Sequence, residues 1–183
     1  MREPSRSEPQ ARKLPLASGV LLLALALVAG LWAATYFGVE ARMVRASARV
    51  VRLAEKTGEE TPVALGLAAN RLGKSLAVDA VLELDDYGPL ATGRQEIVQV
   101  FAQVRSLMAE IAFADPKIVA AKVGKGAVDV HVAARYRLAA ETGEAAEGDG
   151  HADLQWRKGE DGWQIRRAVL RGAEGTRLPG GWK

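Results

Sequence analysis

The stretch HADLQWRKGEDGWQIRRAVLR, residues 151–171, predicts two adjacent antiparallel strands. Within residues 151–158 apolar and polar side chains alternate, which is the period of a strand with one buried face. The Glu-Asp-Gly sequence at 160–162 predicts a tight turn, and a last strand follows at 163–171. We therefore expect a sheet with one apolar face and one polar face.

The sequence immediately before this stretch predicts a second hairpin. Residues 118–123 and 127–139 are rich in valine and alanine and flank a Gly-Lys-Gly turn. In the second strand of this hairpin, apolar side chains such as Val130 alternate with polar ones such as His131. Residues 141–150 are acidic and contain glycine, which predicts a mobile loop between the two hairpins.

The N-terminal half of the chain predicts helices around one short strand. Residues 39–56 continue as a helix, and Thr61 is expected to cap a second helix that runs to about Leu76. Residues 78–85 predict a strand, and a turn follows at 86–89. Thr92, with Gln95 three positions later, is a capping-box pattern that predicts a third helix through Met108.

Residues 14–39 contain no charged side chain and predict one transmembrane helix, since about 20 apolar residues span a bilayer. The alternative is a cleaved signal peptide, but its hydrophobic region is normally only about 7–15 residues long. Residues 1–13 predict a disordered cytoplasmic tail, and 172–183 a flexible C-terminal tail. A short basic N-terminus usually stays in the cytoplasm. We therefore expect a single-pass inner (cytoplasmic) membrane protein with residues 40–171 as a periplasmic or otherwise extracytoplasmic domain.

The order of helices and strands is that of an α+β domain. It resembles the nuclear transport factor 2-like superfamily, which includes SnoaL-like proteins and ketosteroid isomerases. The resemblance rests on LAVDAVLEL at 76–84, TGRQEI at 92–97, and LQWRK and GWQI at 154–158 and 162–165. It covers roughly residues 44–171 and implies a cystatin-like, strongly bent antiparallel sheet that forms a cone packed on N-terminal helices.

Composition excludes several classes of function. The chain has no cysteine, so disulfides, thiol catalysis and zinc-thiolate sites are absent. The net charge is +3, but the basic residues are dispersed and accompanied by only 4 Trp, 3 Tyr and 3 Phe, so we expect no nucleic-acid partner. The sequence also lacks a glycine-rich phosphate loop and a zinc-protease motif, and we expect no cofactor.

The resemblance implies a test for catalysis. Ketosteroid-isomerase-like members use a carboxylate base near the end of the first strand, and the matching position here is Leu84. Asp85 and Asp86 are the remaining, weak candidates for a base. We therefore expect that the protein is not an enzyme, with a SnoaL-like lyase or isomerase as an alternative.

A cone of this kind can enclose a pocket or be filled by side chains. The residues predicted to line a pocket are Leu82, Leu84, Phe101, Tyr136 and Trp156. The two histidines, His131 and His151, are in the polar phase of their strands. A metal site would require them to converge with Asp129 or Asp153, and we expect solvated side chains instead.

One basic stripe follows the predicted anchor, at the helical spacing of Arg42, Arg45, Arg49 and Arg52. It is either a membrane-surface contact with anionic headgroups or a solvated helix face. The leading hypothesis for function is a membrane-anchored, non-enzymatic interaction or accessory module of the cell envelope. It would have a protein partner and a weak homodimer contact through the outer face of the sheet. The alternative is a tethered protein that binds a small apolar ligand.

Overall fold

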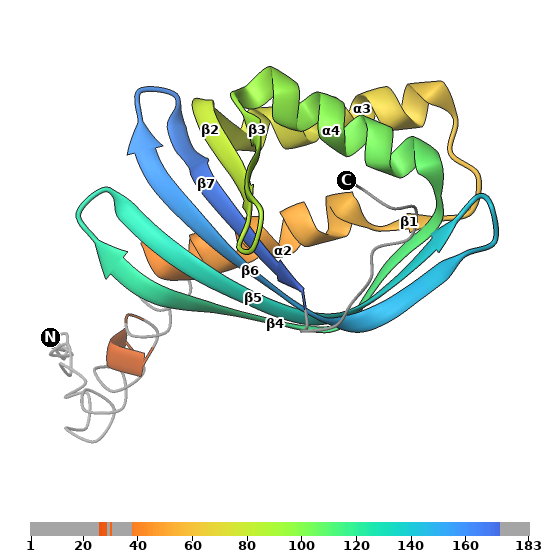
Figure 1. The fold of residues 1–183 in the computed structure, drawn as a ribbon. Helices are drawn as coiled ribbons and strands as arrows, with labels where there is room; N and C mark the ends of the chain where they lie inside the picture. Colours follow the sequence, from red (N-terminus) through yellow and green to blue (C-terminus); the bar gives the residue numbers. More distant parts are fainter. Residues whose placement is uncertain (1–25, 29, 31–37, 173–183) are drawn as a thin grey trace, which may run out of the picture. The chain divides into compact units, whose positions relative to one another are not determined.

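The computed structural model describes residues 26–28, 30 and 38–172 (Figure 1). The chain divides into two compact units, 1–38 and 39–183. Residues 26–28 and 30 are helical, and the rest of the predicted transmembrane helix lies outside the described residues, apart from its last two positions. Within the described ranges, no helix combines the length and the apolar character needed to cross a membrane. The predicted tail at 1–13 also lies outside them, as does the predicted tail at 172–183 apart from Gly172, which is the last residue of β7.

The second unit is an α+β domain with one large curved sheet and helices on its concave side (Figure 1). Its helices are α2 (Val39–Ala54), α3 (Pro62–Ser75) and α4 (Arg94–Leu107). Its strands are β1 (Lys56–Thr57), β2 (Leu76–Leu84), β3 (Gly88–Thr92), β4 (Met108–Gly124), β5 (Ala127–Ala140), β6 (Ala145–Gly159) and β7 (Gly162–Gly172). The predicted helices at 39–56 and 62–76 and the predicted strands at 127–139 and 163–171 are confirmed.

The sheet has the strand order β1-β4-β5-β6-β7-β2-β3. Its neighbouring strands are antiparallel except β2 and β7, which are parallel. The expectation of a wholly antiparallel sheet is therefore wrong at this pair. Strands β4 to β7 are joined by hairpins, which enforce antiparallel pairing, whereas β2 meets β7 through a long connection that leaves either direction open.

Strand β4 is longer than the predicted strand at 118–123 because it continues through a proline. The ladder with β5 shifts register between Ala114 and Lys117, and Asp115 has a positive φ of 49° next to Pro116. A β-bulge both bends a strand and tolerates proline there. The bulge lies in the long, curved part of β4 and β5 (Figure 1). Because proline is unusual inside a strand, the sequence did not predict the half of β4 that precedes residue 118.

The predicted loop at 141–150 is wrong, because β6 already begins at Ala145. Its acidic residues are opposite arginines of β5, with Glu147 paired to Arg137 and Asp149 to Arg135. The Tyr136 ring covers a glycine, since a Cβ added at Gly150 would lie 3.0 Å from Tyr136 Cδ1. Aromatic cover and cross-strand charge pairs stabilise a strand whose composition resembles a loop.

The two predicted helix caps have different outcomes. Thr61 Oγ1 accepts a hydrogen bond from Ala64 N at 3.2 Å, which confirms the start of α3. The capping box at α4 is wrong, because the N-cap is Gly93 and Thr92 is the last residue of β3. Glu96 Oε2 instead accepts from Thr92 N at 2.9 Å. Strand β3 occupies part of a segment that was predicted to be only a turn.

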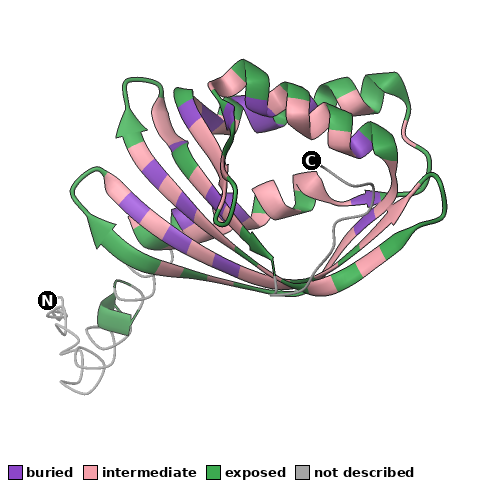
Figure 2. Ribbon diagram, viewed as in Figure 1, coloured by how far each residue is buried: buried purple, intermediate pink, exposed green. Residues whose placement is uncertain are grey.

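The core lies between α2, the other helices and the centres of β5, β6 and β7 (Figure 2). Trp156 is 2% exposed, and its Nε1 donates to Ser47 Oγ of α2 at 2.9 Å. Ser47 is fully buried, so this bond satisfies two polar groups that water cannot reach. Apolar burial supplies most of the stabilisation, and this bond fixes α2 against β6.

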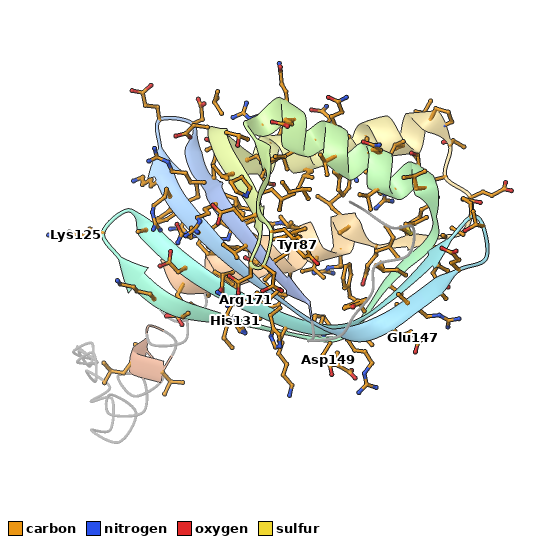
Figure 3. The ribbon with its side chains drawn as sticks, viewed as in Figure 1. Tyr87, Lys125, His131, Glu147, Asp149 and Arg171 are labelled. Carbon is orange, nitrogen blue, oxygen red and sulfur yellow. The ribbon has the colours of Figure 1, made fainter. Side chains whose placement is uncertain are left out.

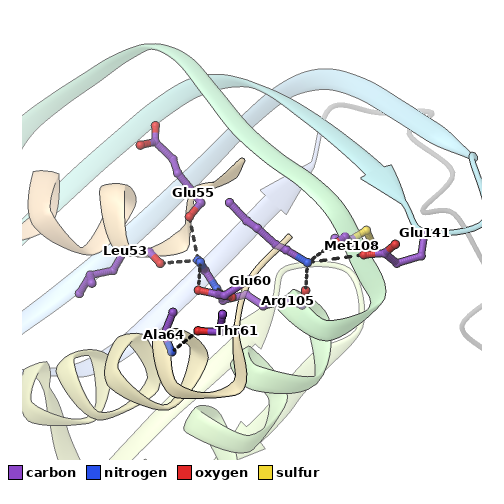
Figure 4. A network of polar contacts seen from close by, with 9 residues as sticks. Leu53, Glu55, Glu60, Thr61, Ala64, Arg105, Met108 and Glu141 are labelled. Atoms are coloured by element: carbon purple, nitrogen blue, oxygen red, sulfur yellow. Dashed lines mark hydrogen bonds and ion pairs between the residues drawn. The ribbon is translucent and has the colours of Figure 1, made fainter. Parts of the chain in front are cut away.

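A buried polar cluster joins the end of α2 to α3 and α4 (Figure 4). Arg105 donates from Nε and Nη2 to the carboxylate of Glu60, at 3.0 and 2.8 Å, and also to two carbonyl oxygens near the end of α2. Lys56 donates to the carbonyl oxygens of Arg105 and Met108, and its Nζ lies 3.6 Å from Glu141. Both cations are buried with partners, which is the arrangement that makes such burial tolerable.

Candidate functional site

The carboxylates at the end of β2 lie on the outer, convex face of the sheet. Leu82 pairs with Ala168 and lies on the inner face with the core, so its neighbour Glu83 lies on the opposite face. Glu83 accepts two hydrogen bonds from Arg167, and Asp85 Oδ2 accepts one from Arg171 Nε at 2.8 Å. Neither Glu83 nor Asp85 is therefore directed into the concave interior of the sheet.

Asp86 and the residue after it lie in the exposed turn between β2 and β3. Tyr87 is 83% exposed there, and Figure 3 shows its place in the turn. An exposed turn carboxylate is surrounded by water rather than enclosed beside a bound substrate, which is where a general base must lie. The structure therefore leaves Asp86 in an exposed turn and holds Asp85 against Arg171 on the outer face.

Five residues form a polar cluster on the outer face, here named the outer-face network: Asp85, His131, His151, Asp153 and Arg171. Figure 3 labels two of them, His131 and Arg171. His131 Nδ1 lies 2.8 Å from Asp153 Oδ1, and Arg171 Nη1 lies 2.7 Å from Asp153 Oδ2. The rings of His131 and His151 stack with their centroids 5.5 Å apart. The network links β5, β6 and β7 to the end of β2.

Electrostatics keep the central carboxylate of this network ionised. Partial burial acts to raise the pKa of Asp153, but the hydrogen bond with His131 and the charge of Arg171 outweigh it and lower the pKa. The hydrogen bond with Asp85 raises the pKa of Arg171 above its ordinary value. A carboxylate with a lowered pKa is a weak proton acceptor at neutral pH, so Asp153 is better suited to hold Arg171 than to remove a proton from a substrate.

The histidines were expected to be solvated, but His131 contacts Asp153 and stacks on His151, which is the convergence that a metal site would require. In the part of the chain that the structure describes, no group of three or more histidine, aspartate or glutamate side chains is arranged to hold a metal ion. The polar phase predicted for His131 and His151 agrees with their place on the outer face.

Further ion pairs extend the outer face on both sides of the network. Arg157 Nη1 lies 2.9 Å from Asp129 Oδ1. Val169 pairs with Asp153 and Glu83, so it lies on this face, yet it is only 6% exposed. The apolar stems of long charged side chains can cover such a residue. The outer face is therefore polar at its surface, of mixed charge, and held in place by contacts between strands.

The five predicted pocket residues have different surroundings in the structure. Leu82 and Phe101 pack against the core, while Leu84 is half-buried and the ring of Tyr136 lies against Gly150. Trp156 is the one of the five that lines a groove of about 750 Å³ between α2 and α3, among the residues that the structure describes.

Only part of the basic stripe on α2 lines this groove. Arg49 and Arg52 line it, whereas Arg42 is exposed elsewhere on α2 and Arg45 is half-buried. Helix α3 contributes further lining residues that the sequence analysis did not single out: Arg71, Lys74 and Ser75. Their spacing on α3 marks one helix face, but the sequence alone does not indicate that this face lies opposite α2. Contact with membrane headgroups stays a prediction for the stripe.

Comparison with known proteins gives the fold. No protein-family model matches the chain, and no curated protein matches it in sequence. Among solved structures, a proposed scytalone dehydratase from Novosphingobium aromaticivorans aligns with a TM-score of 0.54 and 14% identity over 77% of this chain and 95% of its own. A proposed aromatic ring hydroxylase from the same organism aligns with a TM-score of 0.53 and 17% identity over 60% and 78%.

A third similar structure, an NTF2-like protein with a cystatin-like fold from N. aromaticivorans, covers 91% of this chain and 93% of its own, with a TM-score of 0.52 and 16% identity. These likenesses confirm the fold expected from the sequence, a curved sheet packed on helices in a cystatin-like arrangement. At such identities they show the fold alone, and unrelated functions share folds of this kind.

Proposed function

We propose that this chain is a membrane-anchored, non-enzymatic interaction or accessory module of the cell envelope. The observation that carries the proposal is the direction of the β2 carboxylates, since Glu83 and Asp85 are held by arginines on the outer face. A general base must come within roughly 3 Å of the proton that it removes, or reach it through one water. The inner face beside these residues instead presents Leu82, which packs on the core.

The outer face is the surface on which we place the partner. It carries side chains of both signs that are already fixed by contacts between strands, including the outer-face network. A fixed polar surface loses little side-chain entropy on association, and mixed charges suit a polar, specific contact. The same face is proposed to support a weak homodimer.

The anchor and its orientation belong to the same proposal. Residues 14–39 carry no charge and directly precede α2, so the domain is tethered close to the inner (cytoplasmic) membrane with residues 40–171 outside the cytoplasm. Topology reporters test the orientation. Alkaline phosphatase fused after Lys183 is expected to be active, whereas activity of a cytoplasmic reporter at the same position, with an inactive phosphatase, would reverse it.

The experiment that tests the interaction is a chemical crosslinking pulldown of the full-length chain from membranes. We expect one or a few discrete protein partners, or a second copy of the chain, to be captured. Failure to capture any protein would contradict the proposal. An apolar compound that copurifies in that case would favour the alternative, a tethered protein that binds a small apolar ligand.

A further inference from the structure

The groove between α2 and α3 has an apolar floor and a cationic rim. Met43, Ala46 and Trp156 line it and are at most 8% exposed, so they form its floor. The exposed lining residues are cations, namely Arg49, Arg52, Arg71 and Lys74. Its volume of about 750 Å³ lies within the range of small-molecule sites.

These cations differ from most other arginines of the domain in lacking an acidic partner. Among the described residues, Arg49, Arg71 and Lys74 form no ion pair, and no aspartate or glutamate lines the groove. Arg52 donates from Nε to a backbone carbonyl, that of Ala48. Elsewhere in the domain the paired arginines are Arg105, Arg135, Arg137, Arg157, Arg166, Arg167 and Arg171.

The helix dipoles stabilise only some of these cations. Arg52 and Lys74 lie in the last turns of α2 and α3, where a cation is stabilised by the helix C-terminus. Arg49 lies one turn earlier in α2, beyond the strongest part of that effect. Two helices thus direct unpaired positive charge toward one apolar floor, an arrangement that disfavours the empty groove through like-charge repulsion and favours a bound anion.

We propose that this groove binds a small, water-soluble amphiphilic anion. Its oxyanion group, a carboxylate or a phosphate, contacts the guanidinium groups of Arg49 and Arg71, which can offer paired donors to two oxygens. Its apolar body lies on the floor that Met43 and Trp156 form and against Trp163, which also lines the groove. This site lies between α2 and α3, is separate from the outer-face network, and goes beyond the proposed interaction function.

Equilibrium dialysis of the full-length chain in a non-ionic detergent tests this site, with empty micelles as the reference. The probes are naphthyl phosphate and naphthoate, with naphthol as the uncharged compound of matched apolar shape. We expect saturable binding of one or both anions at one site per chain, and at least about tenfold weaker binding of naphthol, since one lost charge-assisted contact amounts to that factor.

The Arg49→Gln, Arg71→Gln double variant is expected to weaken anion binding by at least about tenfold. Arg135→Gln and Lys125→Gln each remove one positive charge away from the groove and should bind as the parent does. Arg71→Lys keeps the charge but loses the paired donors, and should bind with intermediate strength. A circular dichroism melt of each variant separates loss of binding from loss of fold.

Three results would overturn the site. Naphthol could bind as tightly as the anions, the folded double variant could bind as the parent does, or the distant charge variants could weaken binding as much as the groove variants. Binding only to vesicles that contain anionic lipid, with no affinity for the soluble anions, would also overturn it. None of these results depends on whether a protein partner is captured by crosslinking.

Discussion

Arg171 donates a hydrogen bond from Nε to Asp85 Oδ2 over 2.8 Å, and this contact lies on the outer face of the sheet. It connects β7 to the end of β2, which is where the resemblance to ketosteroid-isomerase-like proteins would place a base. A second carboxylate, Asp153, accepts from the same guanidinium. The acid closest to the expected catalytic position is therefore part of a surface contact, while Leu82 and Leu84 alternate with it on the inner side.

The first prediction concerns Asp86, the remaining acid of this region. Asp86 lies in an exposed turn, so Asp86→Asn should change the free energy of unfolding by less than about 0.5 kcal/mol. It should also leave the biological activity of the full-length chain unchanged, as measured by complementation of a deletion strain. A folded, membrane-inserted Asp86→Asn protein without activity would instead indicate an enzyme or a polar ligand site.

The direction of β2 was predictable because alternation fixes it. Once Leu82 and Leu84 bury against the core, Glu83 and Asp85 must lie on the other face. The same reasoning gave the faces of β5 and of residues 151–158 in β6, and the polar position of His131. The sequence could not give the partners on that face, since Arg171 and Asp85 are far apart in the chain and meet only through the parallel pairing of β2 with β7.

The second prediction concerns the bond between Trp156 and Ser47. Ser47→Ala removes the acceptor of a buried indole N–H, and an unsatisfied buried donor costs about 1–3 kcal/mol. Urea unfolding of residues 39–183 measures the loss. Ser106→Ala, at an exposed serine of α4, is the matched control and should cost less than about 0.5 kcal/mol. Equal losses in the two variants would contradict the structural role of the bond.

The third prediction is a pH dependence at Glu60. The hydrogen bond from Arg105 lowers its pKa below the ordinary value of 4.5, against the opposing effect of burial. The folded state therefore binds this proton less readily than the unfolded state does. The stabilisation is complete above pH 4.5 and is lost as the pH falls through the lowered value.

Glu60→Gln should accordingly destabilise residues 39–183 by about 1–3 kcal/mol at pH 7 and by clearly less near pH 3. Urea unfolding at the two pH values gives the comparison. The exposed neighbour provides a control, since Glu59→Gln should have little effect at either pH. If Glu60→Gln lowered the free energy of unfolding by the same amount at pH 7 and at pH 3, the ion pair with Arg105 would not be the source of that stabilisation.

The fourth prediction tests whether β6 is ordered from its start. Gly150→Ala would place a Cβ 3.0 Å from Tyr136 Cδ1, so the ring must move, and we expect a loss of about 1 kcal/mol. Gly66→Ala, in α3 with nothing within 4 Å of its Cβ, should instead stabilise by about 0.5–1 kcal/mol. A neutral Gly150→Ala would support the mobile loop that composition alone predicts.

Several parts of the domain were not predictable because local sequence opposes the tertiary structure. Pro116 hides half of β4 from sequence-based prediction. The acidic, glycine-containing start of β6 is ordered by its pairing with β5, including contacts with Arg135, Tyr136 and Arg137. The groove between α2 and α3 was also not predictable from the sequence, since it depends on how these two helices pack. Periodicity shows which face of each helix is charged, but it does not show which faces meet.

The central claim is that the domain acts by binding a protein through its outer face. A photo-reactive residue at His151, which is exposed on that face, tests it in the full-length chain in membranes. A matched probe at Asn70, exposed on α3, samples the opposite side of the sheet. We predict that irradiation crosslinks the His151 probe to a discrete protein, and the Asn70 probe much less. Crosslinking at Asn70 alone, or at neither position, would contradict the claim.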